Sequence, residues 1–147
     1  MTADFTNKRV LITGGTDGIG LEVARLLASR GAELAIVGRR SFDDVEVPSG
    51  CHYIQADLST PQALDDILSG LAKIGFDNGL DHLVLNASIG YVGPVRDETD
   101  EGLLSLLAVN LKGPLALCQS FYGALAIRSG SVCFISSTAS GLSLIHI

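Results

Sequence analysis

The sequence predicts an α/β fold in which a parallel sheet lies between two layers of helices. Short apolar segments of strand length alternate with longer segments of helical periodicity along the 147 residues. Strands with wholly apolar centres are typical of parallel sheets that helices cover on both faces. No internal repeat, linker or low-complexity segment interrupts this alternation, so we expect one domain.

The first third of the chain predicts a strand, a helix and two further strands. The first apolar segment stops at glycines, and the helix after it places Ile19, Val23, Leu26 and Leu27 on one face before Gly31 ends it. A loop separates the last two strands, because proline and glycine in SFDDVEVPSG break any helix there. The predicted ranges are 9–13, 18–30, 33–37 and 51–56, with the loop at 41–50.

The remaining chain predicts two helices and two strands. Thr60 is a suitable N-cap and Pro61 suits a first helical position. Leu64, Ile67, Leu68 and Leu71 follow at helical spacing. A strand at 81–86, a long helix at 98–127 and a strand at 131–136 complete the pattern. We expect the Gly113-Pro114 pair to kink the long helix, because proline lacks a backbone donor and crowds the preceding turn.

The composition excludes several classes of protein. Hydrophobic residues make up 47% and charged residues 18%, which is too apolar for a disordered chain. The net charge of −6 argues against a nucleic-acid partner. No uninterrupted apolar run reaches the roughly 18 residues of a membrane span, and the start lacks the apolar core of a secretion signal. We therefore expect a cytoplasmic protein without a membrane partner, and the spacing of cysteines and histidines predicts no metal site.

A glycine-rich turn joins the first strand to the first helix and predicts a dinucleotide site. The segment Thr-Gly-Gly-Thr-Asp-Gly-Ile-Gly runs from Thr13 to Gly20. Glycines allow a tight turn and a close approach of backbone to phosphate, and free amides at the helix N-terminus then face the pyrophosphate. The candidate binding residues of this turn are Gly14, Thr16, Asp17, Gly18, Ile19 and Gly20.

Four further segments follow in order, and together with this turn they resemble the short-chain dehydrogenases/reductases. Asp57-Leu58 follows the third predicted strand and Asn86-Ala87 the fourth. Asn110 lies in Val-Asn-Leu-Lys-Gly, and Ser137 ends the fifth strand. The resemblance covers residues 7–141, and the glycine spacing is that of the single-domain oxidoreductase branch. Two positions depart from the family pattern, since Leu85 and Ser88 flank Asn86-Ala87 where the family has asparagine and glycine.

The resemblance implies a Rossmann-type, doubly wound sheet in three αβα layers. It implies hydride transfer between a nicotinamide and a carbonyl or alcohol substrate, in a homo-oligomer that is a dimer or a tetramer. By the same resemblance Asp57 and Leu58 flank the adenine, and Asn86 and Ala87 lie beside the cofactor. Ser137 hydrogen-bonds the substrate oxygen, and Asn110 anchors a proton-relay water.

The end of the second predicted strand favours NADP(H) over NAD(H). An acidic residue there accepts hydrogen bonds from the ribose 2′-hydroxyl and selects NAD. Here Gly38 stands at that place, followed by Arg39 and Arg40. An arginine that pairs with the 2′-phosphate contributes roughly 1.5–3 kcal/mol. Asp17 weakens the prediction, because many NADP-preferring relatives have a basic residue at its position.

The Tyr-x-x-x-Lys pair of the family is absent from the sequence. None of the three tyrosines, Tyr53, Tyr91 and Tyr122, has a lysine four residues later. The family's tyrosine would fall just beyond Ile147, and the final Leu-Ser-Leu-Ile-His-Ile matches the in-frame translation of a transposase-end sequencing adapter. We therefore expect a fragment with an incomplete NAD(P)-binding domain at 1–141, a non-native tail at 142–147 and no turnover.

Two other functions stay open at this stage. A non-catalytic NADP-binding sensor needs no tyrosine and lysine, although Ser137 and Asn110 favour the enzyme. A truncated scaffold is less favoured, because the last predicted strand would leave an exposed apolar edge at Val132, Phe134 and Ile135.

Overall fold

The computed structural model describes residues 4–137, and within them the chain forms one five-stranded parallel sheet. The strand order is β3-β2-β1-β4-β5, so the first strand lies at the centre and the chain winds outward in both directions. This confirms the predicted doubly wound α/β fold. The strands are β1 (Arg9–Thr13), β2 (Glu33–Gly38), β3 (His52–Gln55), β4 (His82–Leu85) and β5 (Ser131–Phe134).

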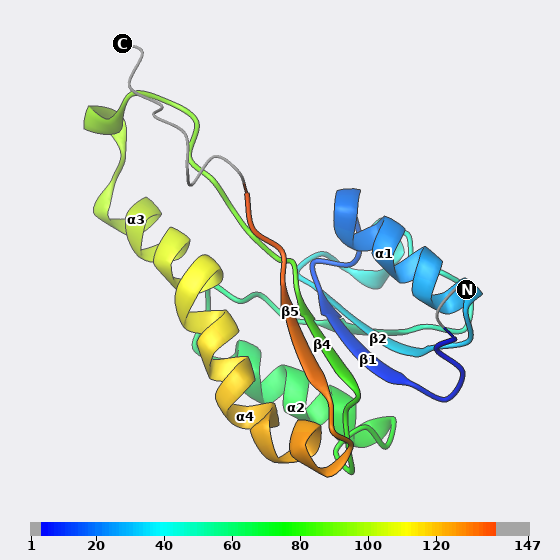
Figure 1. The fold of residues 1–147 in the computed structure, drawn as a ribbon. Helices are drawn as coiled ribbons and strands as arrows, with labels where there is room; N and C mark the ends of the chain where they lie inside the picture. Colours follow the sequence, from blue (N-terminus) through cyan, green and yellow to red (C-terminus); the bar gives the residue numbers. More distant parts are fainter. Residues whose placement is uncertain (1–3, 138–147) are drawn as a thin grey trace.

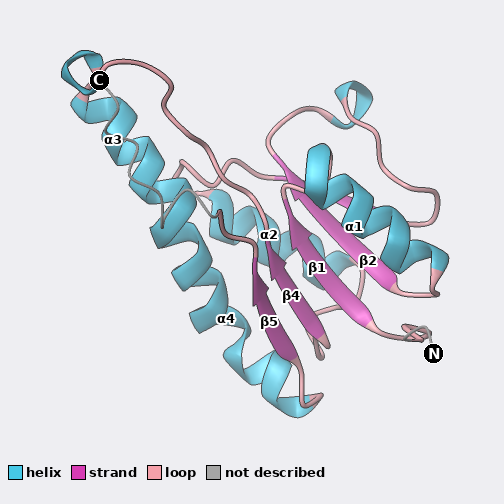
Figure 2. Cartoon of the chain, turned by 45° about the horizontal axis from the view of Figure 1, so that its top comes forward, coloured by secondary structure: helices cyan, strands magenta, loops and turns pink. Residues whose placement is uncertain are grey.

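Helices cover both faces of the sheet, as Figures 1 and 2 show. Helix α1 (Gly18–Ser29) packs on one face against a cluster that includes Val10, Ile12 and Ile36. Helices α2 (Ala63–Lys73) and α4 (Gly113–Ile127) cover the other face. Neighbouring residues of a strand point to opposite faces, so β1 and β2 supply apolar side chains to both clusters.

The buried face of α1 differs from the predicted one. Gly20, Leu21, Ala24 and Leu27 are buried, whereas 65% of the Ile19 surface is exposed and Leu26 is also exposed. The small residues at 20 and 24 let the helix lie close to the sheet, which a pattern of large apolar residues does not reveal.

The start of α2 also differs from the prediction. The helix begins at Ala63 after Gln62, and no side chain caps it. The Thr60 hydroxyl instead donates to the carbonyl of Asp57 at 2.9 Å, so it closes the turn after β3. In the loop expected at 41–50, Phe42–Asp44 forms the short 3₁₀ helix η1.

The predicted long helix is three consecutive helical segments. These are α3 (Asp100–Leu107), the π-helical turn η3 (Ala108–Lys112) and α4, which has Pro114 in its first turn. The helix is thus irregular directly before Gly113-Pro114, at the π-turn, and not at the pair itself. Thr99 caps α3 by accepting a hydrogen bond from the Gly102 amide, and the 3₁₀ helix η2 (Val95–Asp97) precedes it.

By length and composition alone, the combined helix Asp100–Ile127 could cross a membrane, with a mean hydropathy of 1.3 over 18 residues. The sequence-based expectation considered uninterrupted apolar runs, and Lys112 interrupts this one. The core helix of a soluble protein passes the same test when it is mostly buried, and 17% of this window is buried. In this structure Leu117, Phe121 and Leu125 of the helix are buried in the core on the α2 side of the sheet.

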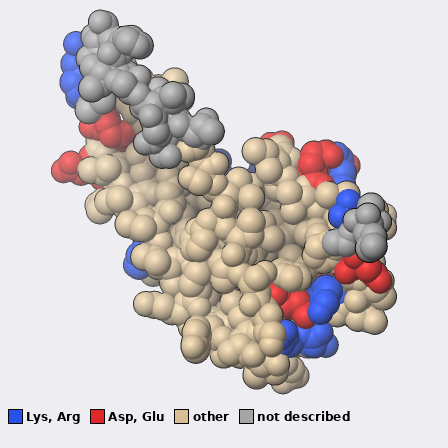
Figure 3. All heavy atoms as spheres, viewed as in Figure 1, with Lys and Arg blue, Asp and Glu red and all other residues tan. Residues whose placement is uncertain are grey.

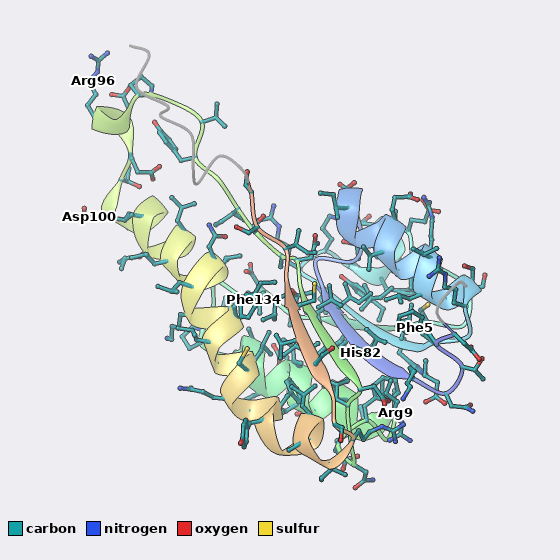
Figure 4. The ribbon with its side chains drawn as sticks, viewed as in Figure 1. Phe5, Arg9, His82, Arg96, Asp100 and Phe134 are labelled. Carbon is teal, nitrogen blue, oxygen red and sulfur yellow. The ribbon has the colours of Figure 1, made fainter. Side chains whose placement is uncertain are left out.

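A buried carboxylate ties together the amino-terminal end of the sheet. The Asp81 side chain, of which 4% is exposed, accepts hydrogen bonds from Lys8 Nζ at 3.1 Å and from Arg128 Nε at 2.8 Å. It also accepts one from the backbone amide of Arg9 at 2.9 Å. The cluster joins β1, β4 and the end of α4, and Figure 4 labels Arg9 and His82 at this end.

Strand β5 forms one edge of the sheet within residues 4–137, and its four residues are exposed. Val132 and Phe134 are 38% and 56% exposed, as predicted for an uncovered apolar edge, whereas Ile135 is partly buried. In Figure 3 the surface around the middle of the molecule carries few charged side chains. The predicted non-native tail at 142–147 lies outside the described residues.

Candidate functional site

Residues at the carboxyl ends of four strands, β1, β2, β3 and β4, line a pocket of about 690 Å³. Ligands of open α/β sheets bind at this edge, where the strand order reverses direction. Of the cofactor-binding residues predicted from the sequence, all but Gly20 line the pocket. They are Gly14, Thr16, Asp17, Gly18, Ile19, Arg39, Arg40, Asp57, Leu58, Asn86 and Ala87.

The glycine turn packs tightly against the end of β4. Gly14 has a φ of +67°, which favours glycine, and a Cβ there would lie 2.9 Å from the Ala87 Cα. Gly20 lies beneath the turn, and its Cβ would come within 3.0 Å of the Gly14 carbonyl oxygen and the Asn86 amide. The absence of these side chains leaves a cradle in which backbone can approach a phosphate.

Asn86 holds the glycine turn through its side chain. Its Nδ2 donates to the carbonyl oxygens of Thr13 at 3.2 Å and Gly14 at 2.9 Å. The buried Thr13 hydroxyl completes the junction by accepting from the backbone amides of Asn86 and Ala87, each at 3.1 Å. Thr13 was missed as a site residue; its polar side chain at the end of an otherwise apolar strand is the signal that could have identified it.

The amino end of α1 faces the pocket, and its helix dipole favours an anion there. Asp17 is the N-cap residue and accepts from the Gly18 amide at 2.7 Å. Its other carboxylate oxygen lies 4.0 Å from Arg40 Nη2. Both side chains are exposed, so this pair contributes little to stability, but it places a cation beside the only acidic group of the glycine turn.

Gly38, Arg39 and Arg40 lie along one wall of the pocket at the end of β2. A Cβ on Gly38 would lie 2.8 Å from the Tyr53 hydroxyl and 3.1 Å from the Thr16 methyl group. No acidic side chain is therefore present or accommodated at this place without movement of its neighbours. Both arginines are exposed and line the pocket, which gives this wall a positive charge.

Asp57 and Leu58 lie across the pocket from the glycine turn, after β3. The amide and hydroxyl of Ser59 donate to the Asp57 carboxylate at 2.9 and 2.7 Å. These bonds lower the pKa of Asp57 below its ordinary value, and the charge of Arg39 adds to the shift. Partial burial opposes the shift but does not outweigh it. Asp57 is therefore ionised at neutral pH and fixes the turn that presents Leu58.

Asn110 lies in the π-turn η3 and binds the backbone of the segment after β4. Its Oδ1 accepts from the Ile89 amide at 3.0 Å, and its Nδ2 donates to the Ile89 carbonyl at 2.8 Å. Ile89 and Val109 line the pocket, so Asn110 fixes one wall without lining it. Ser137, the other predicted catalytic residue, is the last described residue and follows β5 at the same edge of the sheet.

Eight lining residues were not among the predicted binding residues. They are Val37, Gly38, Ala56, Ser59, Ser88, Ile89, Ser105 and Val109. Most are small or apolar and carry no chemical signature, so only their position after a strand or on the facing helix places them here.

Comparison with known proteins agrees with this geometry. The sequence profile of the short chain dehydrogenase family matches residues 8–147. The chain is 33% identical over 141 residues to the hydroxysteroid 11-beta-dehydrogenase 1-like protein B of Xenopus laevis, covering 88% of this chain and 47% of that protein. It spans about half the length of this relative.

Two solved structures of similar fold contain a nicotinamide cofactor. A metagenomic short-chain oxidoreductase in complex with NADP is 30% identical, with a TM-score of 0.77 over 93% of this chain and 64% of its own. A short chain dehydrogenase from Leptospira borgpetersenii with bound NAD+ is 25% identical, with a TM-score of 0.79 over 96% and 56%. With the glycine turn and its pocket, these matches identify the chain as a member of the short-chain dehydrogenase family of oxidoreductases.

Proposed function

We propose that the protein is an NADP-dependent oxidoreductase that interconverts a carbonyl and an alcohol. The observation that carries the NADP preference is the wall formed by Gly38, Arg39 and Arg40, which is cationic where NAD-selecting sites are acidic. A guanidinium pairs with a phosphate through parallel, charge-assisted hydrogen bonds. Bound NADP supplies or accepts the hydride, and the residues of this chain bind and orient it.

Each part of the pocket has a distinct task in this proposal. The glycine turn and the N-terminus of α1 bind the pyrophosphate, and the arginines bind the 2′-phosphate. Asp57 and Leu58 flank the adenine. Asn110 holds the Ile89 backbone. In this proposal Ser137 hydrogen-bonds the substrate oxygen.

Replacing Arg39 with alanine tests the NADP preference. We expect the affinity for 2′,5′-ADP to fall about ten- to hundredfold, because a charge-assisted contact to the 2′-phosphate is lost. The affinity for 5′-AMP, which lacks that phosphate, should stay unchanged. Calorimetric titration of both nucleotides measures the two effects separately.

Arg96→Ala is the matched control. Arg96 is 84% exposed and lies at the far tip of the molecule, away from the sheet (Figure 4). The Arg96→Ala substitution removes one positive charge, as Arg39→Ala does, but it does not alter the pocket. Both nucleotide affinities should therefore match those of the unmodified chain. If Arg39→Ala and Arg96→Ala weaken 2′,5′-ADP equally, the effect is one of net charge and the proposed contact is wrong.

The second candidate function is a non-catalytic NADP-binding module, which needs the nucleotide pocket but no tyrosine and lysine pair. A tyrosine with an ordinary pKa near ~10 needs a nearby cation to transfer protons at neutral pH. We therefore predict that the 147 residues bind NADPH without oxidising it. Loss of absorbance at 340 nm with a panel of aldehydes and ketones would contradict this prediction.

The gene distinguishes the two candidates. Sequencing the gene from an unfragmented template past codon 141 reveals the codons that follow the segment resembling the family. A tyrosine and a lysine four residues apart soon after Ser137 would support the oxidoreductase. An open reading frame that ends at Ile147 would favour the binding module.

A further inference from the structure

Strand β3 contributes side chains that hold the backbone of the two arginines. The Tyr53 hydroxyl donates to the Arg40 carbonyl at 2.7 Å, and Gln55 Nε2 donates to the Arg39 carbonyl at 3.2 Å. Tyr53 and Gln55 are two residues apart, so they point to the same face of the strand. Neither lines the nucleotide pocket.

Tyr53 also fixes the segment after the arginines. Its ring lies 5.9 Å from the Phe42 ring, and Phe42 belongs to η1, two residues after Arg40. The tyrosine is partly buried against the cluster on the α1 side of the sheet. Its ring and hydroxyl therefore hold the start of this loop at two points, Arg40 and Phe42.

The Tyr53 hydroxyl lies where a side chain on residue 38 would extend. A Cβ on Gly38 would lie 2.8 Å from that oxygen, inside ordinary contact distance. The hydroxyl cannot simply turn away without losing its hydrogen bond to Arg40. Burial raises the pKa of Tyr53, although the charge of Arg40 opposes this, so the phenol stays protonated and remains a donor at neutral pH.

We propose that Tyr53 is a positioning residue for nucleotide selection. It holds the Arg40 backbone so that the arginines face the 2′-phosphate, and it occupies the space that an NAD-selecting acidic side chain needs. This inference rests on the proposed NADP preference. In this proposal the selection of NADP over NAD depends on β3 as well as on the end of β2. Tyr53 acts through Arg40, because Tyr53 itself does not line the nucleotide pocket.

The test is Tyr53→Phe in the 147-residue chain, which removes one oxygen atom and keeps the ring. The probes are 2′,5′-ADP and 5′-AMP, each titrated by calorimetry. We expect the ratio of their affinities to fall about two- to tenfold, as for the loss of one hydrogen bond, while the 5′-AMP affinity stays constant. Tyr122→Phe is the control, because Tyr122 is 76% exposed on α4, and it should leave both affinities unchanged.

A second pair of variants tests the steric part of the proposal. Gly38→Asp alone should gain little affinity for NAD+, because the Tyr53 hydroxyl obstructs the new side chain. The same substitution with Tyr53→Phe should bind NAD+ at least fivefold more tightly than Gly38→Asp alone. The unfolding midpoint of each variant without nucleotide shows whether it is folded.

The outcomes separate the two proposals. If the unmodified chain binds 2′,5′-ADP no more tightly than 5′-AMP, the NADP preference itself fails, and with it the selection that Tyr53 would position. If that preference is present and Tyr53→Phe leaves it intact, only the role of Tyr53 is overturned. An equal loss for both probes would make Tyr53 a structural residue, which also overturns the inference.

Discussion

Replacing Gly20 with alanine is expected to abolish nucleotide binding and to lower the free energy of unfolding by about 3 kcal/mol, the upper part of the range for overpacking. The added Cβ would come within 3.0 Å of the Gly14 carbonyl oxygen and of the Asn86 side-chain amide. Backbone of the glycine turn must then move, and the hydrogen bonds from Asn86 to that turn break with it. Urea unfolding and NADPH titration measure the two effects.

Gly123→Ala provides the matched control. Gly123 lies in α4, is exposed, and a Cβ there meets no atom within 4 Å. Alanine should therefore stabilise the chain by about 0.5–1 kcal/mol, because it restricts the unfolded backbone and favours the helix. If Gly20→Ala stabilises the chain as Gly123→Ala does and still binds NADPH, the packing of the turn against Asn86 does not require glycine at position 20.

Asp81→Asn is the second change with a large expected effect, about 3 kcal/mol of lost stability. Removing one member of a buried ion pair usually costs about 3–5 kcal/mol, and the lower end applies because Lys8 and Arg128 are partly exposed. The cluster lies at the opposite end of the sheet from the pocket. Nucleotide affinity of the folded variant should therefore stay unchanged while its unfolding midpoint falls.

The same cluster predicts a dependence of stability on pH. Burial opposes ionisation of Asp81, but the hydrogen bonds from the Arg9 amide, Lys8 and Arg128 outweigh it and lower the pKa below its ordinary value. The stabilisation is therefore complete above the unfolded pKa of about 3.9 and is lost as the pH falls toward the lower folded value. The midpoint of the unmodified chain should fall more steeply below about pH 4 than that of Asp81→Asn.

Asp97→Asn is the control for this series. Asp97 is 56% exposed in its pair with Arg96, and surface pairs contribute little to stability. Its unfolding midpoint and pH profile should match those of the unmodified chain. A midpoint of Asp81→Asn that also matches would show that the Asp81 cluster does not stabilise the sheet.

The fold could be predicted because its strands are nearly continuous apolar segments. The strand assignments differ from the structure by at most two residues at an end, since chain breakers and polar residues bound each segment. The buried face of α1 could not be predicted in this way. Gly20 and Ala24 give no hydrophobic signal, yet they set how closely the helix approaches the sheet.

The residues of the pocket were predictable where motif and position agree, as for the glycine turn and Asp57. The contacts that hold these residues were not. Tyr53 looks like an ordinary aromatic residue of a strand, and its bond to Arg40 depends on how β3 lies beside β2. The partners of Asn86 likewise lie 72 and 73 residues earlier in the chain, so only the folded sheet brings them together.

That separation has a consequence for the order of events on the ribosome. The glycine turn is synthesised well before the side chain that holds its carbonyls, because Asn86 follows Gly14 by 72 residues. At a synthesis rate of about 5–20 residues per second, this interval lasts roughly 4–14 s. During that time β1 also lacks its neighbour β4, which supplies one side of the ladder. The nascent chain therefore completes the proposed nucleotide cradle only after β4 and Asn86 have emerged, although the glycine turn emerges earlier.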